Sequence, residues 1–212
     1  GDFIYTRAFQ MMTSLGSLKV LEVMSEAVNV IAEGEVLQLM NVNDPDITEE
    51  SYMRVIYSKT ARLFEAAAQC SGILAGASEA QERALQDYGR YLGTAFQLID
   101  DLLDYSADGE RLGKNVGDDL NEGKPTLPLL HAMHNGTPAQ AQMIREAIEQ
   151  GNGRHLLDPV LETMAACGSL EWTRARAEEE ADKAIAALEI LSPSPWRDAL
   201  IALAHMSVQR DH

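Results

Sequence analysis

Cysteine is scarce in this sequence, which has only Cys70 and Cys167 among its 212 residues. The two lie far apart in apolar, alanine-rich surroundings, so neither a disulfide framework nor a zinc site built on cysteine is expected. Isolated cysteines of this kind usually pack as small apolar side chains, and they stay reduced inside the cell. The cysteine content therefore predicts a cytoplasmic protein without disulfides.

Basic residues are also few. The chain has 17 Lys and Arg against 33 Asp and Glu, which gives a formal net charge of −16. Nucleic acids and anionic membrane surfaces attract basic proteins, so neither is expected to be the main partner. The acidic excess fits cation binding or simply a soluble surface, and a soluble surface explains most of it.

Long apolar runs and strand patterns are missing too. No apolar run approaches the roughly 18 residues that cross a bilayer, so no transmembrane segment is expected. No alternating strand or hairpin pattern occurs either. Helical apolar spacing recurs instead, and it predicts helices at 3–12, 18–40, 52–74, 85–103, 126–133, 139–148, 156–164, 170–191 and 196–208.

These helices predict an all-α bundle in which residues 1–212 form a single domain. The Ser/Thr-x-x-Gln patterns at Ser78 and Thr137 are typical of helix starts. The chain does not begin with Met, and its helical apolar pattern begins at once. We therefore expect the natural start to lie upstream of Gly1.

The stretch FQLIDDLLDY places three aspartates, Asp100, Asp101 and Asp104, in a segment that otherwise resembles a buried helix. On a helical wheel they fall with Gln97 within an arc of roughly 100°, away from the apolar stripe. No Lys or Arg stands on this helix at a spacing that would compensate their mutual repulsion. The charges are therefore confined to one face, which is either a solvated acidic surface or a binding site.

The segment 106–125, SADGERLGKNVGDDLNEGKP, follows directly and is long, polar and rich in glycine. Loops of this kind in compact helical domains are often functional. Oxygen ligands without His or Cys favour a hard cation such as Mg²⁺, which completes its shell with substrate phosphates. Aspartates facing Lys114 and Lys124 would therefore form a magnesium–diphosphate site, although the spacing alone leaves the solvated face open.

FQLIDDLLD followed by GKNVGDDLNEGKPTLPLL resembles the second aspartate-rich motif and following loop of the trans-polyprenyl diphosphate synthases. GDFIYTRAF, EGEVLQ and YSKTA are similar to three further segments of that family. The resemblance implies an all-α homodimer that lengthens an allylic diphosphate, such as farnesyl diphosphate, by repeated addition of isopentenyl diphosphate. Within the family the chain is most similar to bacterial members that make the ubiquinone side chain.

The resemblance also implies a metal site. Asp100, Asp101 and Asp104 match the carboxylates that hold Mg²⁺ against the allylic diphosphate, and they are expected to be catalytic. Asp118 matches an aspartate that lies near the same metal. The sequence DDLNE at 118–122 imitates a further aspartate-rich motif, but it lies in a glycine-flanked loop and is not counted as one.

Five residues match positions that contact the allylic substrate in that family. The lysines among them are directed at its diphosphate, and two of these, Lys59 and Lys114, are also expected to be catalytic. The matching residues are Lys59, Thr60, Gln97, Lys114 and Lys124.

The family's first aspartate-rich motif and the arginines after it have no counterpart here, and they would precede Gly1. We therefore expect a fragment that lacks its N-terminal helices and cannot catalyse condensation alone. Product length is gated in that upstream region of the family, so no residue of this chain indicates it.

Two other functions remain possible from the sequence. A non-catalytic partner subunit of a heteromeric prenyl synthase would keep the fold, but it would not need the retained aspartates or Lys59. A class I terpene cyclase usually has an Asn/Asp-x-x-Ser/Thr-x-x-x-Glu metal motif, which is absent from this sequence.

Overall fold

The computed structural model describes residues 1–106 and 116–210. All regular elements within these ranges are helical, so the predicted all-α fold class is confirmed. Shorter helical segments are the π-helix η1 (Tyr57–Ala61) and the 3₁₀ helices η2 (Gly153–Leu156) and η3 (Leu188–Ile190). The α-helices are α1 (Asp2–Ser14), α2 (Leu18–Asn41), α3 (Glu49–Ile56), α4 (Arg62–Leu74), α5 (Glu79–Leu103), α7 (Asp118–Asn121), α8 (Leu127–Asn135), α9 (Pro138–Gln150), α10 (Leu157–Cys167), α11 (Ser169–Ala187) and α12 (Pro195–Val208).

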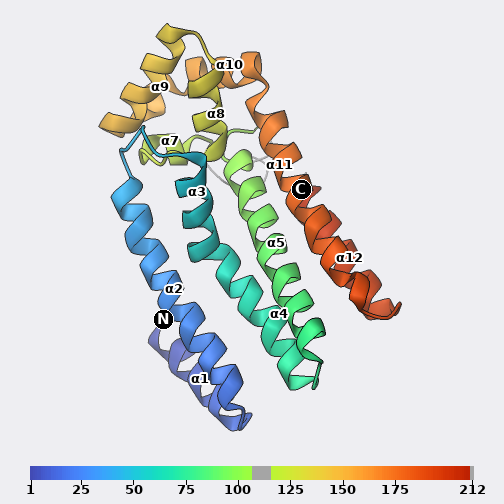
Figure 1. The fold of residues 1–212 in the computed structure, drawn as a ribbon. Helices are drawn as coiled ribbons and strands as arrows, with labels where there is room; N and C mark the ends of the chain where they lie inside the picture. The colour runs from blue at the N-terminus through green and yellow to red at the C-terminus, as the bar shows by residue number, and fades with distance from the viewer. Residues whose placement is uncertain (107–115, 211–212) are drawn as a thin grey trace.

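The helices form an elongated bundle (Figure 1). α2, α4, α5, α11 and α12 run along its length, whereas α7 to α10 gather at one end. α1 folds back beside α2 towards the other end, and α5 lies between α4 and α11 and packs against both. The organisation of residues 1–212 as one domain stays a prediction.

The central helix α5 begins at a capping box, as the sequence predicts. The Ser78 hydroxyl accepts a hydrogen bond from Gln81 N, and Gln81 Oε1 accepts one from Ser78 N. The apolar side of the helix is buried, because Leu98, Ile99 and Leu102 are each at most 2% exposed. Fully burying a side chain of this size stabilises the fold by about 1.5–3 kcal/mol. This burial offsets the poor helix propensity of the aspartates on the other side.

The predicted helix at 52–74 is divided into α3, η1 and α4. The π-helical segment Tyr57–Ala61 contains Lys59 and Thr60, and it packs against α2 and α5. α2 can approach it closely because residue 34 is glycine: a Cβ there would lie 2.8 Å from Ser58 Cβ. Segments of π-helix inside α-helices are frequent at functional sites, and this one carries two of the predicted substrate contacts.

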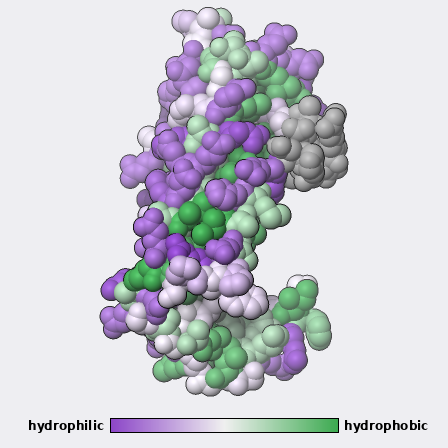
Figure 2. Space-filling view, turned by 90° about the vertical axis from the view of Figure 1, so that its right-hand side faces the viewer, coloured by the Kyte–Doolittle hydropathy of each residue, from purple (hydrophilic) through white to green (hydrophobic). Residues whose placement is uncertain are grey.

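Several large apolar side chains remain on the surface. Phe3, Ile4, Leu39 and Met40, on α1 and α2, are between 72% and 80% exposed. On the face shown in Figure 2, the upper part is mostly hydrophilic and hydrophobic patches lie in the middle and lower parts. Within the two described ranges, no helix combines the length and hydropathy needed to span a membrane.

Candidate metal and diphosphate site

A cavity of about 430 Å³ opens between the C-terminal half of α2, α3, η1, the C-terminal half of α5 and the segment 118–126. It is lined by every predicted site residue that the structure describes. Lys114 is the exception, because it lies outside the described residues. The predicted residues that line the cavity are Lys59, Thr60, Gln97, Asp100, Asp101, Asp104, Asp118 and Lys124.

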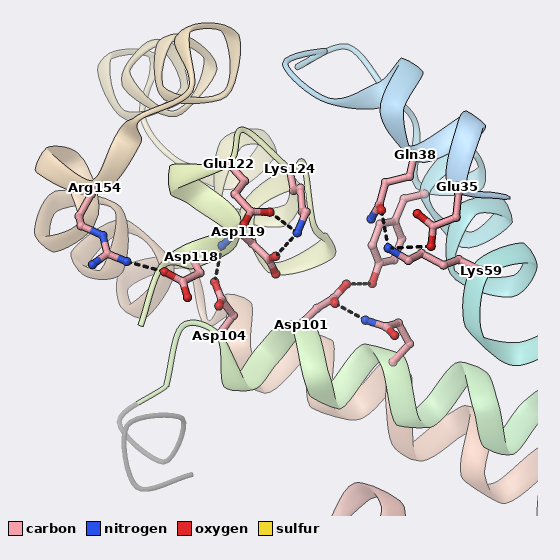
Figure 3. Close-up of polar contacts among 12 residues, drawn as sticks. Glu35, Gln38, Lys59, Asp101, Asp104, Asp118, Asp119, Glu122, Lys124 and Arg154 are labelled. Atoms are coloured by element: carbon pink, nitrogen blue, oxygen red, sulfur yellow. Dashed lines mark hydrogen bonds and ion pairs between the residues drawn. The ribbon is translucent and has the colours of Figure 1, made fainter. Parts of the chain in front are cut away.

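Asp101 is a buried carboxylate of the α5 cluster, and each of its oxygens accepts a hydrogen bond. The Tyr52 hydroxyl donates a hydrogen bond to Oδ2 (2.6 Å), and the Gln97 amide donates one to Oδ1 (2.7 Å) (Figure 3). The residue is 6% exposed. Burial and, to a smaller extent, the charge of nearby Asp119 raise the pKa of Asp101 to about 7, although the two hydrogen bonds oppose the shift.

The Gln97 amide joins this carboxylate to the π-helix. Its Oε1 accepts a hydrogen bond from the Thr60 hydroxyl (2.9 Å), while its Nε2 donates to Asp101. Both ends of the amide are therefore engaged, and its orientation is set by the two neighbours. The chain Thr60–Gln97–Asp101–Tyr52 links η1, α5 and α3 across the cavity wall.

Lys59 lies on another side of the cavity and is held by α2. Its Nζ donates to Gln38 Oε1 (2.6 Å) and forms an ion pair with Glu35 Oε1 (3.3 Å) (Figure 3). About a third of the side chain is exposed (35%). The partners come from the EGEVLQ segment, so that motif positions the lysine of the YSKTA motif.

The segment that begins at Gly117 is tied to the aspartates of α5. Gly117 has a φ of +81°, which glycine adopts without strain, and its N–H donates to Asp104 O (2.8 Å). The N–H of Asp119 then donates to Asp104 Oδ2 (3.0 Å). Further along, Gly123 O accepts a hydrogen bond from Asn43 N (2.9 Å). Hydrogen bonds to two distant segments thus fix this loop beside the cavity.

The two adjacent aspartates of the loop face different surroundings. Asp118 is directed toward Arg154, with which it forms an ion pair, and its side chain is 45% exposed (Figure 3). Asp119 lies on the Asp101 side, where its Oδ1 is 3.4 Å from Lys124 Nζ. Burial raises the pKa of Asp119, whereas Lys124 lowers it.

Asp119 and Tyr52 are two residues beside the α5 carboxylates to which the sequence assigned no role. The doubled aspartate in GDDLNE was a signal for Asp119, but only the backbone conformation decides which of the two lies beside Lys124 and which pairs with Arg154. The hydroxyl of Tyr52 has no sequence signal, since buried tyrosines are common in helical cores. The predicted metal role of Asp118 stays a prediction.

The donor set of the cavity fits a magnesium ion that is shared with a substrate. The described lining residues include carboxylates, amides and hydroxyls, but no His or Cys. Among the residues of 1–106 and 116–210, no three His, Cys, Asp or Glu side chains converge on one metal position. Mg²⁺ commonly takes only one or two protein carboxylates and completes its shell with phosphate oxygens and water.

The remaining wall of the cavity is apolar. Val42, Ile47, Val55 and Ile56 line it together with the polar groups. A space lined by both charged and aliphatic side chains suits a ligand with a polar head and a hydrocarbon body.

Comparison with known proteins gives a consistent set of relatives. A family described as Polyprenyl synthetase matches residues 1–164. Octaprenyl diphosphate synthase of Escherichia coli (strain K12) is 88% identical over 211 residues, which cover 100% of this chain and 65% of that protein. An all-trans-nonaprenyl-diphosphate synthase (geranyl-diphosphate specific) of Rhodobacter capsulatus is 45% identical over 210 residues, covering 99% of this chain and 64% of that protein.

A solved structure agrees with these matches. The crystal structure of polyprenyl synthase from Caulobacter crescentus CB15, complexed with calcium and isoprenyl diphosphate, superposes with a TM-score of 0.93. The two sequences are 43% identical, and the match covers 100% of this chain and 65% of that one. The chain thus spans about 65% of the length of the Escherichia coli relative and of this structure.

Proposed function

Since this chain belongs to the polyprenyl synthetase family, we propose that it acts as a trans-polyprenyl diphosphate synthase. This prenyltransferase would add isopentenyl diphosphate head-to-tail to an allylic diphosphate such as farnesyl diphosphate. The observation that carries the proposal is that the α5 aspartates, Lys59 and Lys124 line one cavity although they come from separate segments.

The metal of this reaction is proposed to be Mg²⁺. Asp100, Asp101 and Asp104 on α5 and Asp118 in the loop are the predicted ligands. Because Asp101 is hydrogen-bonded on both oxygens and Asp118 pairs with Arg154, we expect Asp100 to contribute most to holding the ion against the allylic diphosphate. When bound, the ion would neutralise charge that develops on the departing diphosphate. The relative from Caulobacter crescentus, whose structure contains calcium and isoprenyl diphosphate, supports a divalent cation beside a diphosphate.

The residues of this chain would act mainly through charge and exclusion of water. As the allylic C–O bond breaks, the leaving diphosphate gains negative charge, which the ammonium groups of Lys59 and Lys124 stabilise more than they stabilise the ground state. Lys114 is proposed to act in the same way, and Thr60 and Gln97 to contact the substrate. The apolar wall keeps water from the allylic cation while the isopentenyl double bond attacks it. The proton lost from the new cation would pass to the departed diphosphate.

The proposed product is octaprenyl diphosphate, the precursor of a ubiquinone side chain. The 88% identity to the Escherichia coli enzyme of that name supports this length. The Rhodobacter capsulatus relative, at 45% identity, is named for a nonaprenyl product, so the family fold alone does not set the length. A homodimer in the cytoplasm remains the proposed assembly and location.

The test is condensation by this chain joined to the part of the Escherichia coli relative that it does not span. With labelled isopentenyl diphosphate, farnesyl diphosphate and Mg²⁺, the expected product is octaprenyl diphosphate. Lys59→Ala should lower kcat/KM at least about tenfold through lost transition-state stabilisation. The control is Lys183→Ala, which removes an exposed lysine that pairs with Glu180 on α11, outside the cavity. A cyclised hydrocarbon product, or equal activity of the two variants, would contradict the proposal.

A further inference from the structure

The buried hydroxyl of Tyr52 is hydrogen-bonded to the α5 carboxylate cluster. The proposed condensation chemistry gives this hydroxyl no role. Tyr52 comes from α3, is 4% exposed, and lines the cavity. Its hydroxyl donates to Asp101 Oδ2 at 2.6 Å, across the space between α3 and α5. A buried hydroxyl and a buried carboxylate are tolerated in a protein interior when they form a hydrogen bond with each other.

Each hydrogen bond around Asp101 is donated to the Asp101 carboxylate, either directly or through the Gln97 amide. The Thr60 hydroxyl donates to Gln97, the Gln97 amide donates to Asp101 Oδ1, and Tyr52 donates to Oδ2. Each oxygen of this buried carboxylate therefore has a protein donor. Asp100 and Asp101 both line the cavity, and Asp100 is the less buried of the two.

The same bonds also hold the π-helix. Tyr52 lies on α3, the helix directly before η1, and Thr60 lies within η1. The segment from α3 to η1 is therefore hydrogen-bonded to α5 at two points. Lys59 stands between these two ties. Its Nζ contacts Gln38 and Glu35 on α2. The side chain of Lys59 is thus held by α2, while its backbone lies in the segment that the bonds to Gln97 and Asp101 tie to α5.

We propose that Tyr52 is a positioning residue for the diphosphate site: with Gln97 it holds Asp101 as an anchor, and this anchor sets the places of Asp100 and Lys59. The proposal rests on the proposed function of the cavity. It assigns Asp101 the task of organising the site, whereas Asp100, which is less buried, would face the metal and diphosphate. Outer-shell partners that orient metal-binding groups typically account for 10–100-fold in metal affinity.

The test compares Tyr52→Phe with Tyr88→Phe in the 212-residue chain. Tyr88 is a matched control, because it is 3% exposed and its hydroxyl donates a hydrogen bond to Leu200 O (2.9 Å), away from the cavity. Each variant removes one buried hydroxyl and leaves the ring in place. Binding of farnesyl diphosphate in the presence of Mg²⁺ is measured by calorimetry, and thermal unfolding is followed by circular dichroism.

Both variants should unfold at a somewhat lower temperature, since each loses a buried hydrogen bond. Only Tyr52→Phe should weaken Mg²⁺-dependent farnesyl diphosphate binding, by about tenfold or more. Equal binding by Tyr52→Phe and the unsubstituted chain would overturn the positioning role while leaving the proposed function intact. So would an equal loss of binding in Tyr88→Phe. Absence of Mg²⁺-dependent binding by the unsubstituted chain would overturn the proposed function and this role with it.

Discussion

Asp101 is a buried carboxylate that lies near the carboxylates of Asp100 and Asp119. Burial and nearby Asp119 raise its pKa to about 7, and the Tyr52 and Gln97 hydrogen bonds do not fully offset them. A neighbouring cation would favour the ionised form. At the scale of single residues, the ionised form of this carboxylate cluster is therefore unfavourable until a cation binds beside it.

This pKa predicts how metal affinity depends on pH. Below about pH 7 the cluster retains a proton that Mg²⁺ must displace, so affinity should rise as pH increases from 6 to 8. Calorimetry in two buffers of different ionisation enthalpy should show proton release near pH 6.5 and much less near pH 8.5. An affinity that does not change over this range would contradict the prediction.

The raised pKa of Asp101 also predicts how the stability of the metal-free fold depends on pH. Rising pH should lower this stability, whereas it raises the affinity for Mg²⁺. Because the folded pKa of Asp101 is raised, the folded state binds more protons than the unfolded state between about pH 4 and pH 7. The contribution of this group to the free energy of unfolding is present at low pH and is lost as pH rises through about 7. Mg²⁺ with a diphosphate should restore stability at the higher pH.

The loop aspartates offer a second prediction at this scale. Asp119 lies beside Lys124 and the α5 carboxylates, whereas the side chain of Asp118 is 45% exposed and pairs with Arg154. We expect Asp119→Asn to weaken Mg²⁺-dependent farnesyl diphosphate binding by about tenfold or more, and Asp118→Asn to change it less than about twofold. The reverse order would support Asp118 as the metal residue, as the sequence motif suggested.

At the scale of helices, the sequence predicted most of the fold because apolar periodicity and capping residues are local signals. The Ser78 and Thr137 capping boxes occur as expected, and so does the long helix that carries the aspartates. The break at Tyr57–Ala61 was not predicted, since a π-helical segment depends on what packs against it. The helix at Asp118–Asn121 was missed within the predicted loop for a similar reason: its start depends on Gly117 and Asp104.

In the candidate site too, features that depend on contacts between distant segments could not be predicted from the sequence. Motifs identified the residues, and the structure brings those that it describes to one cavity. The orientation of Asp118 and Asp119 could not be predicted, because adjacent side chains in a helix point about 100° apart and the start of this helix is set by distant contacts. The tie from Tyr52 to Asp101 joins residues 49 positions apart, and no local pattern marks it.

Helix packing around the π-helix gives a further prediction. In Gly34→Ala the new Cβ would lie 2.8 Å from Ser58 Cβ and 2.9 Å from Lys59 N, so α2 must move away from η1. We expect the free energy of unfolding to fall by about 1–3 kcal/mol, together with weaker diphosphate binding. Urea unfolding measures the first effect.

Gly72→Ala in α4 is the control for that variant. The nearest atom to its Cβ is the end of the flexible Leu85 side chain at 3.0 Å. Alanine is preferred over glycine in a helix interior by about 1 kcal/mol, so this variant should be close to neutral. Equal stability of the two variants would show that the approach of α2 to η1 is not tight.

At the scale of the whole molecule, the fold brings together segments that are distant in sequence. The C-terminal half of α2, the π-helix, α5 and the loop after Gly117 each place at least one polar or charged side chain around the cavity. The aliphatic side chains of residues 42–56 complete its wall. The bundle therefore serves to place carboxylates, lysines and an apolar surface around one ligand.

The central claim is that these groups bind a magnesium–diphosphate, and one measurement tests it most directly. Farnesyl diphosphate is titrated into the 212-residue chain with Mg²⁺, with EDTA, and with Mg²⁺ after Asp100→Ala. We predict binding only with Mg²⁺, and a loss of affinity of about tenfold or more in the variant, because a carboxylate facing the metal is removed. Binding that is equally tight in EDTA, or unchanged by Asp100→Ala, would contradict the account.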